Sequence, residues 1–313
     1  MKICIFGNKS STSELISYLF EKGFLIHTLI CVNENVSKKN IISGHDKNLP
    51  LLADKFGIEV VEISDYSLSS KTNQNFFKKR NFDLGLSTGW QRIIPGEILS
   101  QFKYGVFGWH GSGFNLPNGR GRSPLNWSIR LGLKSVYHNC FRYGVSADDG
   151  DLFDIKKIKI NQGDHIKDIQ FKALQHIKKT SIMLIKSIIN DKLKLKKQPK
   201  LPFIIFPKLD ESSGHIDPYC LSAFDAMNIV RSCSKPFPGA FIRVKEFKSL
   251  IRIWNAEVKK ISLSKSEVGK IEIYKNFILV NFFDGFLKLT SFDIEPYVLN
   301  FKKYKKLTAQ IEV

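Results

Sequence analysis

The sequence has no long apolar run and few cysteines, and these absences exclude several classes of protein. No stretch approaches the ~18 apolar residues that a membrane-spanning helix needs, and residues 1–7 are too short and too strand-like for a signal peptide. We therefore expect a cytoplasmic protein without a membrane partner. The five cysteines are scattered and include no Cys-x-x-Cys pair, which argues against disulfides, a metal site and redox chemistry. We interpret them as reduced core residues.

Two further absences concern nucleotides and nucleic acids. Only Gly7 follows the first expected strand, so the Gly-x-Gly-x-x-Gly loop of dinucleotide-binding proteins is missing. The formal charge of +19 attracts phosphate polyanions, but the excess is mainly lysine spread along the chain. Aromatic residues are not interleaved with arginine as on a base-stacking surface. We interpret the charge as a solvated basic surface, with a nucleotide-linked small molecule or tRNA as the alternative acidic partner.

The pattern of the first third of the chain predicts its fold. The composition, 43% hydrophobic and 25% charged in 313 residues, suffices for one sizeable core and a smaller second domain. Strand-like and helix-like runs alternate, which is typical of a parallel sheet covered by helices. The expected strands are 2–7, 25–32, 58–63, 83–87 and 104–108, and the expected helices begin at a capping box on Ser11, near Leu49 and near Asn73. We predict an α/β fold with a Rossmann-like parallel sheet, whose ligands bind beyond the carboxyl ends of the strands.

The later sequence has a different character. A long amphipathic helix is expected at about 165–190, and the basic, proline-punctuated segment 192–202 is typical of a linker. A short helix near 221–232 precedes alternating runs between 240 and 292, which predict a small β-rich domain. We therefore expect two domains, a catalytic α/β domain at 1–191 and a β-rich C-terminal domain at 203–313.

The segment from Gly105 to Trp127 carries the candidate chemistry. It joins a strand end, a glycine-rich loop that begins at His110, and a helix start at Ser123-Pro124, which supplies free backbone N–H groups. A histidine accepts and returns a proton near neutral pH, and a nearby aspartate fixes its tautomer and supports its charged form. Either Asp148 or Asp151 could serve His110 in this way. The combination predicts a small acid-base site.

These residues carry a family resemblance. Residues 83–151 resemble the catalytic domain shared by methionyl-tRNA formyltransferase and the sugar N-formyltransferases, which take a formyl group from 10-formyltetrahydrofolate. The family pattern Asn-x-His-x-Ser-Leu-Leu-Pro-x-x-x-Gly-x-x-Pro, followed by Trp, is met at His110, Ser112, Leu116, Pro117, Gly121, Pro124 and Trp127. The later Asp-x-Gly-Asp pattern is met at Asp148, Gly150 and Asp151. Colinear matches at 215–217, 229–241 and 251–256 extend the resemblance to about Ala256.

The resemblance implies a site and a co-substrate. His110 is then catalytic, and Asp148 is the counterpart of the family's catalytic aspartate. Ser112 positions the loop or the substrate, with a plain turn hydroxyl as the alternative. Trp90 could be a core residue rather than part of the folate site. The residues that correspond to the family's pterin-binding segments are Thr88, Gly89, Trp90, Ile93, Tyr143 and Asp148. The implied co-substrate is 10-formyltetrahydrofolate, with no metal.

The chain departs from the family pattern at two places. Gly108 stands where the family has a catalytic Asn, and the loop after Ser112 is longer by two residues. In the family that Asn helps to bind the formyl oxygen as it gains negative charge, and losing one such donor costs about 10²–10³ in rate. Asn115 or a loop N–H is the expected replacement; alternatively, His110 carries more of the load or the chemistry is lost.

The resemblance therefore implies an N-formyltransferase. We expect the acceptor to be the amine of a nucleotide-linked amino sugar, because the family members that act on such sugars share the segment 236–241 and a short β-rich ending. Methionyl-tRNA formyltransferase is the first alternative, and a catalytically silent binding protein that keeps the folate fold is the second. The sequence does not determine the oligomeric state, and a homodimer stays open.

Overall fold

The computed structural model describes residues 1–42, 44–244, 249–261, 264, 267–274, 276–295 and 306–310. The chain divides into two compact units that are interleaved along the sequence. The first comprises 1–121, 137–158 and 172–205, and the second comprises 122–136, 159–171 and 206–313. The expected domain boundaries, 1–191 and 203–313, remain a prediction.

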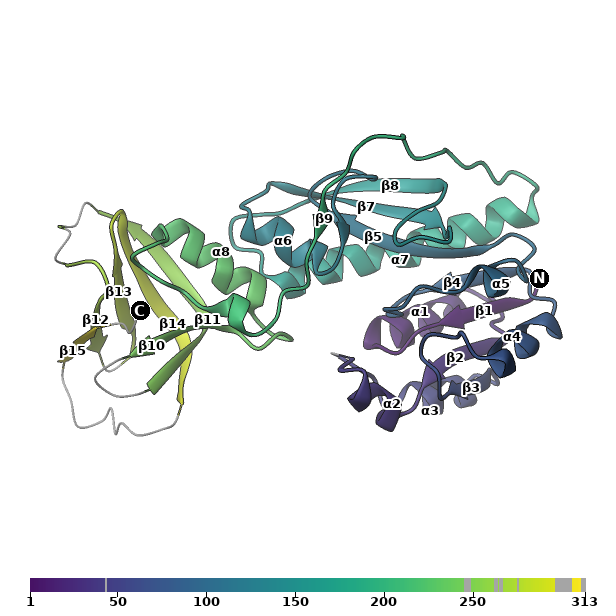
Figure 1. The fold of residues 1–313 in the computed structure, drawn as a ribbon, viewed down its shortest axis with the longest axis horizontal. Coiled ribbons are helices and arrows are strands. Elements are labelled where there is room, and N and C mark those ends of the chain that lie inside the picture. The colour runs from purple at the N-terminus through teal and green to yellow at the C-terminus, as the bar shows by residue number, and fades with distance from the viewer. Residues whose placement is uncertain are drawn as a thin grey trace. The chain divides into compact units, whose positions relative to one another are not determined.

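The first unit is built on a seven-stranded sheet (Figure 1). Its strand order is β3-β2-β1-β4-β5-β7-β8, with parallel pairing from β3 to β5 and antiparallel pairing between β5 and β7. The predicted α/β fold with a mostly parallel, Rossmann-like sheet is confirmed. The strands are β1 (Ile3–Phe6), β2 (Thr28–Val32), β3 (Glu59–Ile63), β4 (Leu84–Ser87), β5 (Val106–Ser112), β7 (Ser135–Arg142) and β8 (Leu152–Lys159).

Helices cover both faces of this sheet, because apolar side chains point alternately to either side of each buried strand. In β1, Ile3 and Ile5 join a core with α1, α3 and α7, whereas Cys4 and Phe6 join a second core with α4 and α5. None of the described helices combines the length and hydropathy that a bilayer span requires. The helices are α1 (Ser10–Glu21), α2 (Glu34–Lys39), α3 (Leu49–Lys55), α4 (Lys71–Lys78), α5 (Gly96–Leu99) and α7 (Ile166–Ile189), of which residues 172–189 belong to this unit.

Strand β5 positions the candidate site. Phe107 and Trp109 point into the core that includes α7, so the alternating residues Gly108 and His110 face the opposite side of the sheet. β7 pairs with β5 so that Phe141 lies opposite Gly108. The chain that follows Phe141 therefore passes beside the side-chain positions of β5 that carry the predicted chemistry.

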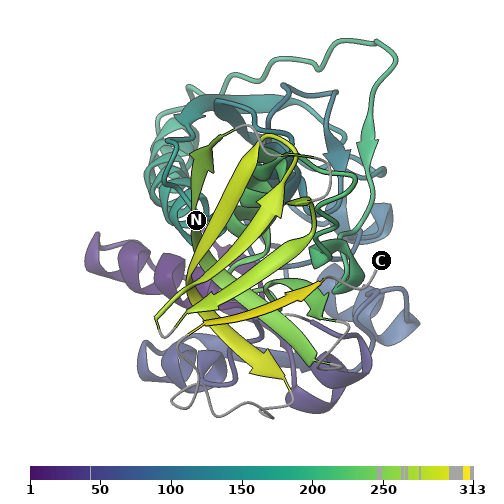
Figure 2. The ribbon, with the colours of Figure 1, turned by 90° about the vertical axis from the view of Figure 1, so that its left-hand side faces the viewer.

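The second unit contains a six-stranded sheet, seen face-on in green to yellow in Figure 2. Its order is β10-β11-β14-β13-β12-β15, and its described pairs are antiparallel. Helix α8 (Ala223–Cys233) contributes Ile229 and Val230 to a core shared with the sheet. The strands are β10 (Ala240–Val244), β11 (Ser249–Lys260), β12 (Lys270–Tyr274), β13 (Ile278–Phe282), β14 (Gly285–Glu295) and β15 (Lys306–Gln310). The remaining elements of the chain are β6 (Arg120–Gly121), α6 (Pro124–Arg130), β9 (Ile205–Phe206) and the short 3₁₀ turn Ser212–Gly214.

Two local expectations are wrong. The capping box predicted on Ser11 does not form, because α1 begins at Ser10 and Thr12 takes over the cap. The Thr12 hydroxyl accepts from the Lys9 N–H at 3.3 Å and donates to the carbonyl of Thr88 at 2.7 Å. Cys220 is exposed, whereas the other four cysteines are buried as expected.

Candidate active site

His110 lies near the end of β5 with its ring between two hydrogen-bond acceptors. Its Nε2 is 2.7 Å from the carbonyl oxygen of Gly119, and its Nδ1 is 3.3 Å from Oδ1 of Asp148. Only 6% of the residue is exposed. Of the two aspartates that the sequence left open, Asp148 faces His110, while Asp151 pairs with the guanidinium of Arg142 at 2.7 Å. The structure thus brings together the predicted histidine and the predicted aspartate.

A tight turn aims the Asp148 carboxylate. Its φ of 51° lies in the left-handed region, which aspartate tolerates better than most residues. Oδ2 accepts from the N–H of Gly121 at 3.0 Å, and the side chain of Gln198 donates to the Asp148 carbonyl at 3.0 Å. Gly150 completes the turn with a φ of 131°, where a Cβ would overlap the carbonyl oxygen of Arg142. The turn therefore holds the carboxylate against β5 by contacts on both of its sides.

The protonation of this pair follows from its partners. Burial by itself raises the pKa of the Asp148 carboxyl, but the hydrogen bond and charge of His110, then Gly121 and Arg120, bring that pKa below its usual value. Asp148 is therefore a carboxylate at neutral pH. A carbonyl only accepts, so Nε2 of His110 carries a proton toward Gly119, and a neutral ring has no second N–H for Asp148. In its neutral form the ring can take one more proton on Nδ1, beside the Asp148 carboxylate, which is what a general base needs.

A tyrosine side chain fills the space beside Gly108. A Cβ on residue 108 would overlap the hydroxyl oxygen and two ring carbons of Tyr143. The N–H of Tyr143 donates to the carbonyl of Val106 at 2.7 Å, and its hydroxyl donates to Oγ of Ser87 at 3.2 Å. Burial raises the pKa of Tyr143 to about 12, so the hydroxyl keeps its proton near neutral pH. The side-chain space of residue 108 is therefore taken by Tyr143.

Ser112 and Asn115 occupy the turn that follows β5. The Ser112 hydroxyl is buried and accepts from the N–H of Phe114 at 3.2 Å, which is the bond of a turn-forming serine. Asn115 is exposed, and its carbonyl accepts from the N–H of Asn118 at 3.0 Å. These bonds stay within the turn, and the catalytic roles of both residues remain predictions.

The expected folate-binding segment follows β4. Thr88 is buried, and Gly89 has a φ of 77°. Trp90 is 8% exposed, and its ring packs edge-on against Tyr66 at a centroid distance of 4.7 Å, so it is a core residue. Ile93 is 55% exposed and presents an apolar surface. Pterin binding by this segment remains a prediction.

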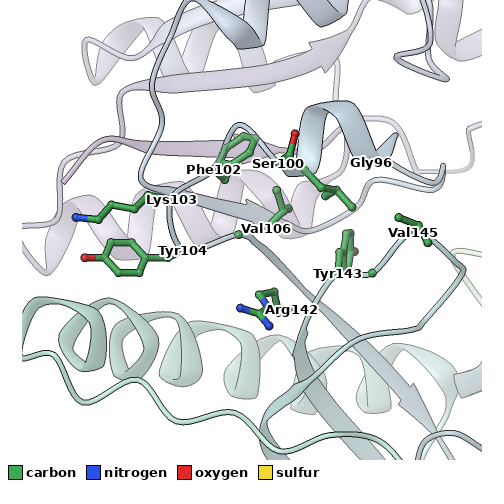
Figure 3. Close-up of a pocket in the computed structure, with 12 residues that line it drawn as sticks. Gly96, Ser100, Phe102, Lys103, Tyr104, Val106, Arg142, Tyr143 and Val145 are labelled. Carbon is green, nitrogen blue, oxygen red and sulfur yellow. The ribbon is translucent and has the colours of Figure 1, made fainter.

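A pocket of about 310 Å³ lies between α5, the start of β5 and the chain after β7 (Figure 3). Lys103 and Tyr104 lie on one side of it, and Tyr143 and Val145 lie on the other. His110 and Asp148 do not line this pocket. Tyr143 is therefore the residue through which the pocket adjoins the site on β5.

A second imidazole–carboxylate cluster lies on the opposite face of β7. Nδ1 of His138 is 2.7 Å from Nδ1 of His176, and Nε2 of His176 is 2.7 Å from Oδ2 of Asp154. Both rings are buried, and burial lowers the pKa of each. No sequence pattern pointed to this cluster, because it forms only when α7 packs under β7.

Comparison with known proteins reveals distant relatives along most of the chain. No protein-family model matches the chain. A methionyl-tRNA formyltransferase of Caldanaerobacter subterraneus subsp. tengcongensis is 25% identical over 261 residues, which cover 82% of this chain and 81% of that protein. The bifunctional polymyxin resistance protein ArnA of Wigglesworthia glossinidia brevipalpis is 28% identical over 268 residues, which cover 82% of this chain and 38% of that longer protein. The predicted resemblance to the formyltransferase family is confirmed. The predicted class, a formyl-transferring enzyme, is confirmed.

Solved structures of formyltransferases share the fold. WlaRD, a sugar 3N-formyl transferase solved with dTDP and 5-N-formyl-THF, has a TM-score of 0.65 and 19% identity, covering 99% of this chain and 97% of that one. The N-formyltransferase of Helicobacter canadensis, solved with folinic acid and dTDP-3-aminofucose, has a TM-score of 0.63 and 17% identity, covering 94% of this chain and 100% of that one. At these identities the matches establish the fold of the formyltransferase family for this chain.

Proposed function

We propose that this protein transfers the formyl group of 10-formyltetrahydrofolate to the primary amine of a nucleotide-linked amino sugar. The observation that carries the proposal is the buried His110–Asp148 pair, which has a place for one more proton at the end of a central strand. The acceptor class is supported by the two solved sugar enzymes, which align with nearly the whole chain. The net charge of +19 suits a diphosphate group.

The reaction needs a base and a place for negative charge. The amine nitrogen attacks the formyl carbon, so a new C–N bond forms and the bond between the formyl carbon and N10 breaks. One proton leaves the amine and one proton joins N10, so the pair at His110 and Asp148 can take the first and return the second. Negative charge builds on the formyl oxygen during attack, and fixed hydrogen-bond donors stabilise it.

The residues that would hold the folate follow β4 and β7, the two strands that pair with β5. Ile93 offers an apolar surface for the ring system, and Tyr143 and Val145 form one wall of the adjoining pocket. The turn from Tyr143 to Asp148 brings this wall within the same segment as the catalytic carboxylate. This apolar and polar mixture fits a reduced pterin with a formyl group that faces His110.

Methionyl-tRNA formyltransferase activity is the second candidate. Several relatives by sequence carry that name, at 25–27% identity. The net charge of +19 would also suit tRNA. The two candidates share the donor and the His110–Asp148 chemistry, so only the acceptor separates them.

Initial rates with 10-formyltetrahydrofolate test the proposal. We expect transfer to one or more members of a panel of nucleotide-linked amino sugars, and none to methionyl initiator tRNA or without an acceptor. Calorimetry with 5-formyltetrahydrofolate should show binding and a raised melting temperature. Transfer to tRNA alone would overturn the acceptor assignment, and folate binding without transfer to any acceptor would favour a silent binding protein.

A further inference from the structure

On the face of β5 that carries His110, the hydroxyl of Tyr143 occupies the side-chain space of Gly108. Gly108 and His110 are two residues apart on the strand and therefore point to the same side of the sheet, about 7 Å apart. The space of a side chain on residue 108 is taken by the Tyr143 hydroxyl and ring edge. Gly108 and Tyr143 are thus complementary, because the absence of a Cβ on one residue admits the phenol of the other.

We propose that Tyr143 is a catalytic residue whose hydroxyl donates a hydrogen bond to the formyl oxygen as the acceptor amine attacks. This inference rests on the proposed formyl transfer. The donor would come from β7 and its following turn rather than from β5 or from the loop at Asn115. The formyl carbon would then lie between this donor and the His110–Asp148 pair. The formyl oxygen would accept from Tyr143, and the amine proton would go to the His110–Asp148 pair.

The charge state and the partner of Tyr143 suit this role. With a pKa raised to about 12, the phenol stays neutral and keeps its proton at neutral pH. It donates to Ser87 Oγ at 3.2 Å, and each hydroxyl can both donate and accept. If Ser87 donates to Tyr143 instead, the phenol proton turns toward the formyl oxygen. The serine then polarises the phenol, and the chain of two hydroxyls makes a stronger donor.

Tyr143 is partly buried and Asn115 is exposed, which favours Tyr143 as the donor. The Tyr143 ring packs against Phe141 at a centroid distance of 5.3 Å, and the Tyr143 backbone N–H is bonded to the carbonyl of Val106 on β5. Asn115 is exposed on the turn after β5. A donor that is fixed in a buried site needs no reorganisation during reaction and stabilises developing charge more than an exposed one.

Removal of the hydroxyl alone tests the proposal. Tyr143→Phe keeps the ring that fills the space at Gly108, and we expect its kcat to fall by about 10²–10³ with little change in the acceptor KM. Tyr18→Phe, at a partly buried tyrosine on α1 that does not line the pocket, is the matched control and should leave kcat unchanged. Ser87→Ala should lower kcat by less than Tyr143→Phe, because the phenol remains.

A second readout does not need turnover. In the infrared spectrum of bound 10-formyl-5,8-dideazafolate labelled with ¹³C at the formyl carbon, the formyl C=O band should move to higher frequency in Tyr143→Phe, because it loses a donor. A structural role for the ring would not move this band.

If the wild type transfers formyl and Tyr143→Phe matches it in kcat and in band position, Tyr143 is not the donor and the proposed function stands. If the wild type binds the analogue but transfers nothing, the proposed function fails. The band shift alone then shows whether the Tyr143 hydroxyl donates to the formyl oxygen. Absence of binding would overturn both.

Discussion

Two imidazole–carboxylate clusters lie on opposite faces of the same strands, and their proton counts differ. In the cluster of His138, His176 and Asp154, one N–H of His138 donates to His176, and one N–H of His176 donates to the carboxylate. Each bond has one proton while both rings are neutral. At His110 both ring nitrogens face acceptors, and a neutral ring satisfies only one of them.

The difference separates a structural cluster from a chemical one. In the cluster of His138, His176 and Asp154, which we call the saturated cluster, each of the two bonds already has its proton. The low pKa of both rings keeps them neutral. In its neutral form the His110 ring can take a further proton on Nδ1. Its carboxylate comes from a turn and has a side chain that is 22% exposed. The phenol of Tyr143 fills the side-chain space of Gly108, two residues before His110 on β5. The same two residue types form a packed cluster on one face, and on the other face they form the pair to which we assign proton transfer.

The comparison is tested most strongly at His110 and Asp148. His110→Asn and Asp148→Asn should each lower kcat by at least ~10², because the pair loses its place for the amine proton. The double variant should lose little more than either single one, because the two groups act as a unit. Steady-state rates, with circular dichroism to confirm folding, measure this. Wild-type turnover in either folded variant would remove that residue from the reaction.

A methyl group on Gly108 tests the space that the Tyr143 side chain fills on the His110 face. Gly108→Ala should lower kcat at least ~10-fold and the free energy of unfolding by about 1–3 kcal/mol, because its Cβ displaces Tyr143 from a packed site. Gly163→Ala is the control, because no atom lies near its Cβ position. Denaturant unfolding and initial rates measure both effects. Gly108→Asn combined with Tyr143→Ala should recover part of the kcat that Gly108→Asn loses alone, and equal losses would show that the two positions are independent.

Removal of a ring from the saturated cluster should lower stability and leave kcat nearly unchanged. His176→Leu leaves His138 and Asp154 without their partner, and an unsatisfied buried polar group costs about 1–3 kcal/mol. The free energy of unfolding should fall by that amount, while kcat of the folded variant stays within about 3-fold of the wild type, because His110 is untouched. Urea unfolding and initial rates separate the two quantities. A kcat loss as large as that of His110→Asn would show that both faces serve the reaction.

The sequence predicted the parts of this comparison that depend on local pattern. Alternating strands and helices, and the colinear motif around His110 and Asp148, are short-range signals, and both the fold and the pairing of these two residues follow from them. The contact of Tyr143 with Gly108 depends on the register of β7 on β5, which residue spacing does not fix. A short element such as α5 has too few residues for a periodic pattern, so it was missed.

The sequence did not predict the saturated cluster, because this cluster also depends on tertiary packing. His138 and His176 meet because α7 packs on one face of β7, and neither residue lies in a recognisable motif. The proton count at His110 also needs the position of the Gly119 carbonyl, which comes from a glycine-rich loop with no periodicity. Residue types and order can thus identify a pair of catalytic groups, whereas their protonation and their neighbours require coordinates.

The smallest expected effect is a pH dependence of stability that belongs to the saturated cluster. The folded-state pKa values of His138 and His176 lie below the ordinary value of 6.5, so below about pH 6.5 the unfolded chain binds protons that the folded chain does not. The free energy of unfolding should therefore be highest above that pH and fall as the pH decreases, by at most ~1.4 kcal/mol per pH unit for each extra proton. Urea unfolding at pH 7.5, 6.5 and 5.5 measures the slope.

His27 and His165 also have lowered pKa values and give a slope of the same sign, but they are unchanged in His176→Leu. The difference in slope between the wild type and this variant isolates the cluster. Equal slopes would show that the cluster titrates as it does in the unfolded chain, and its neutral, saturated description would be wrong.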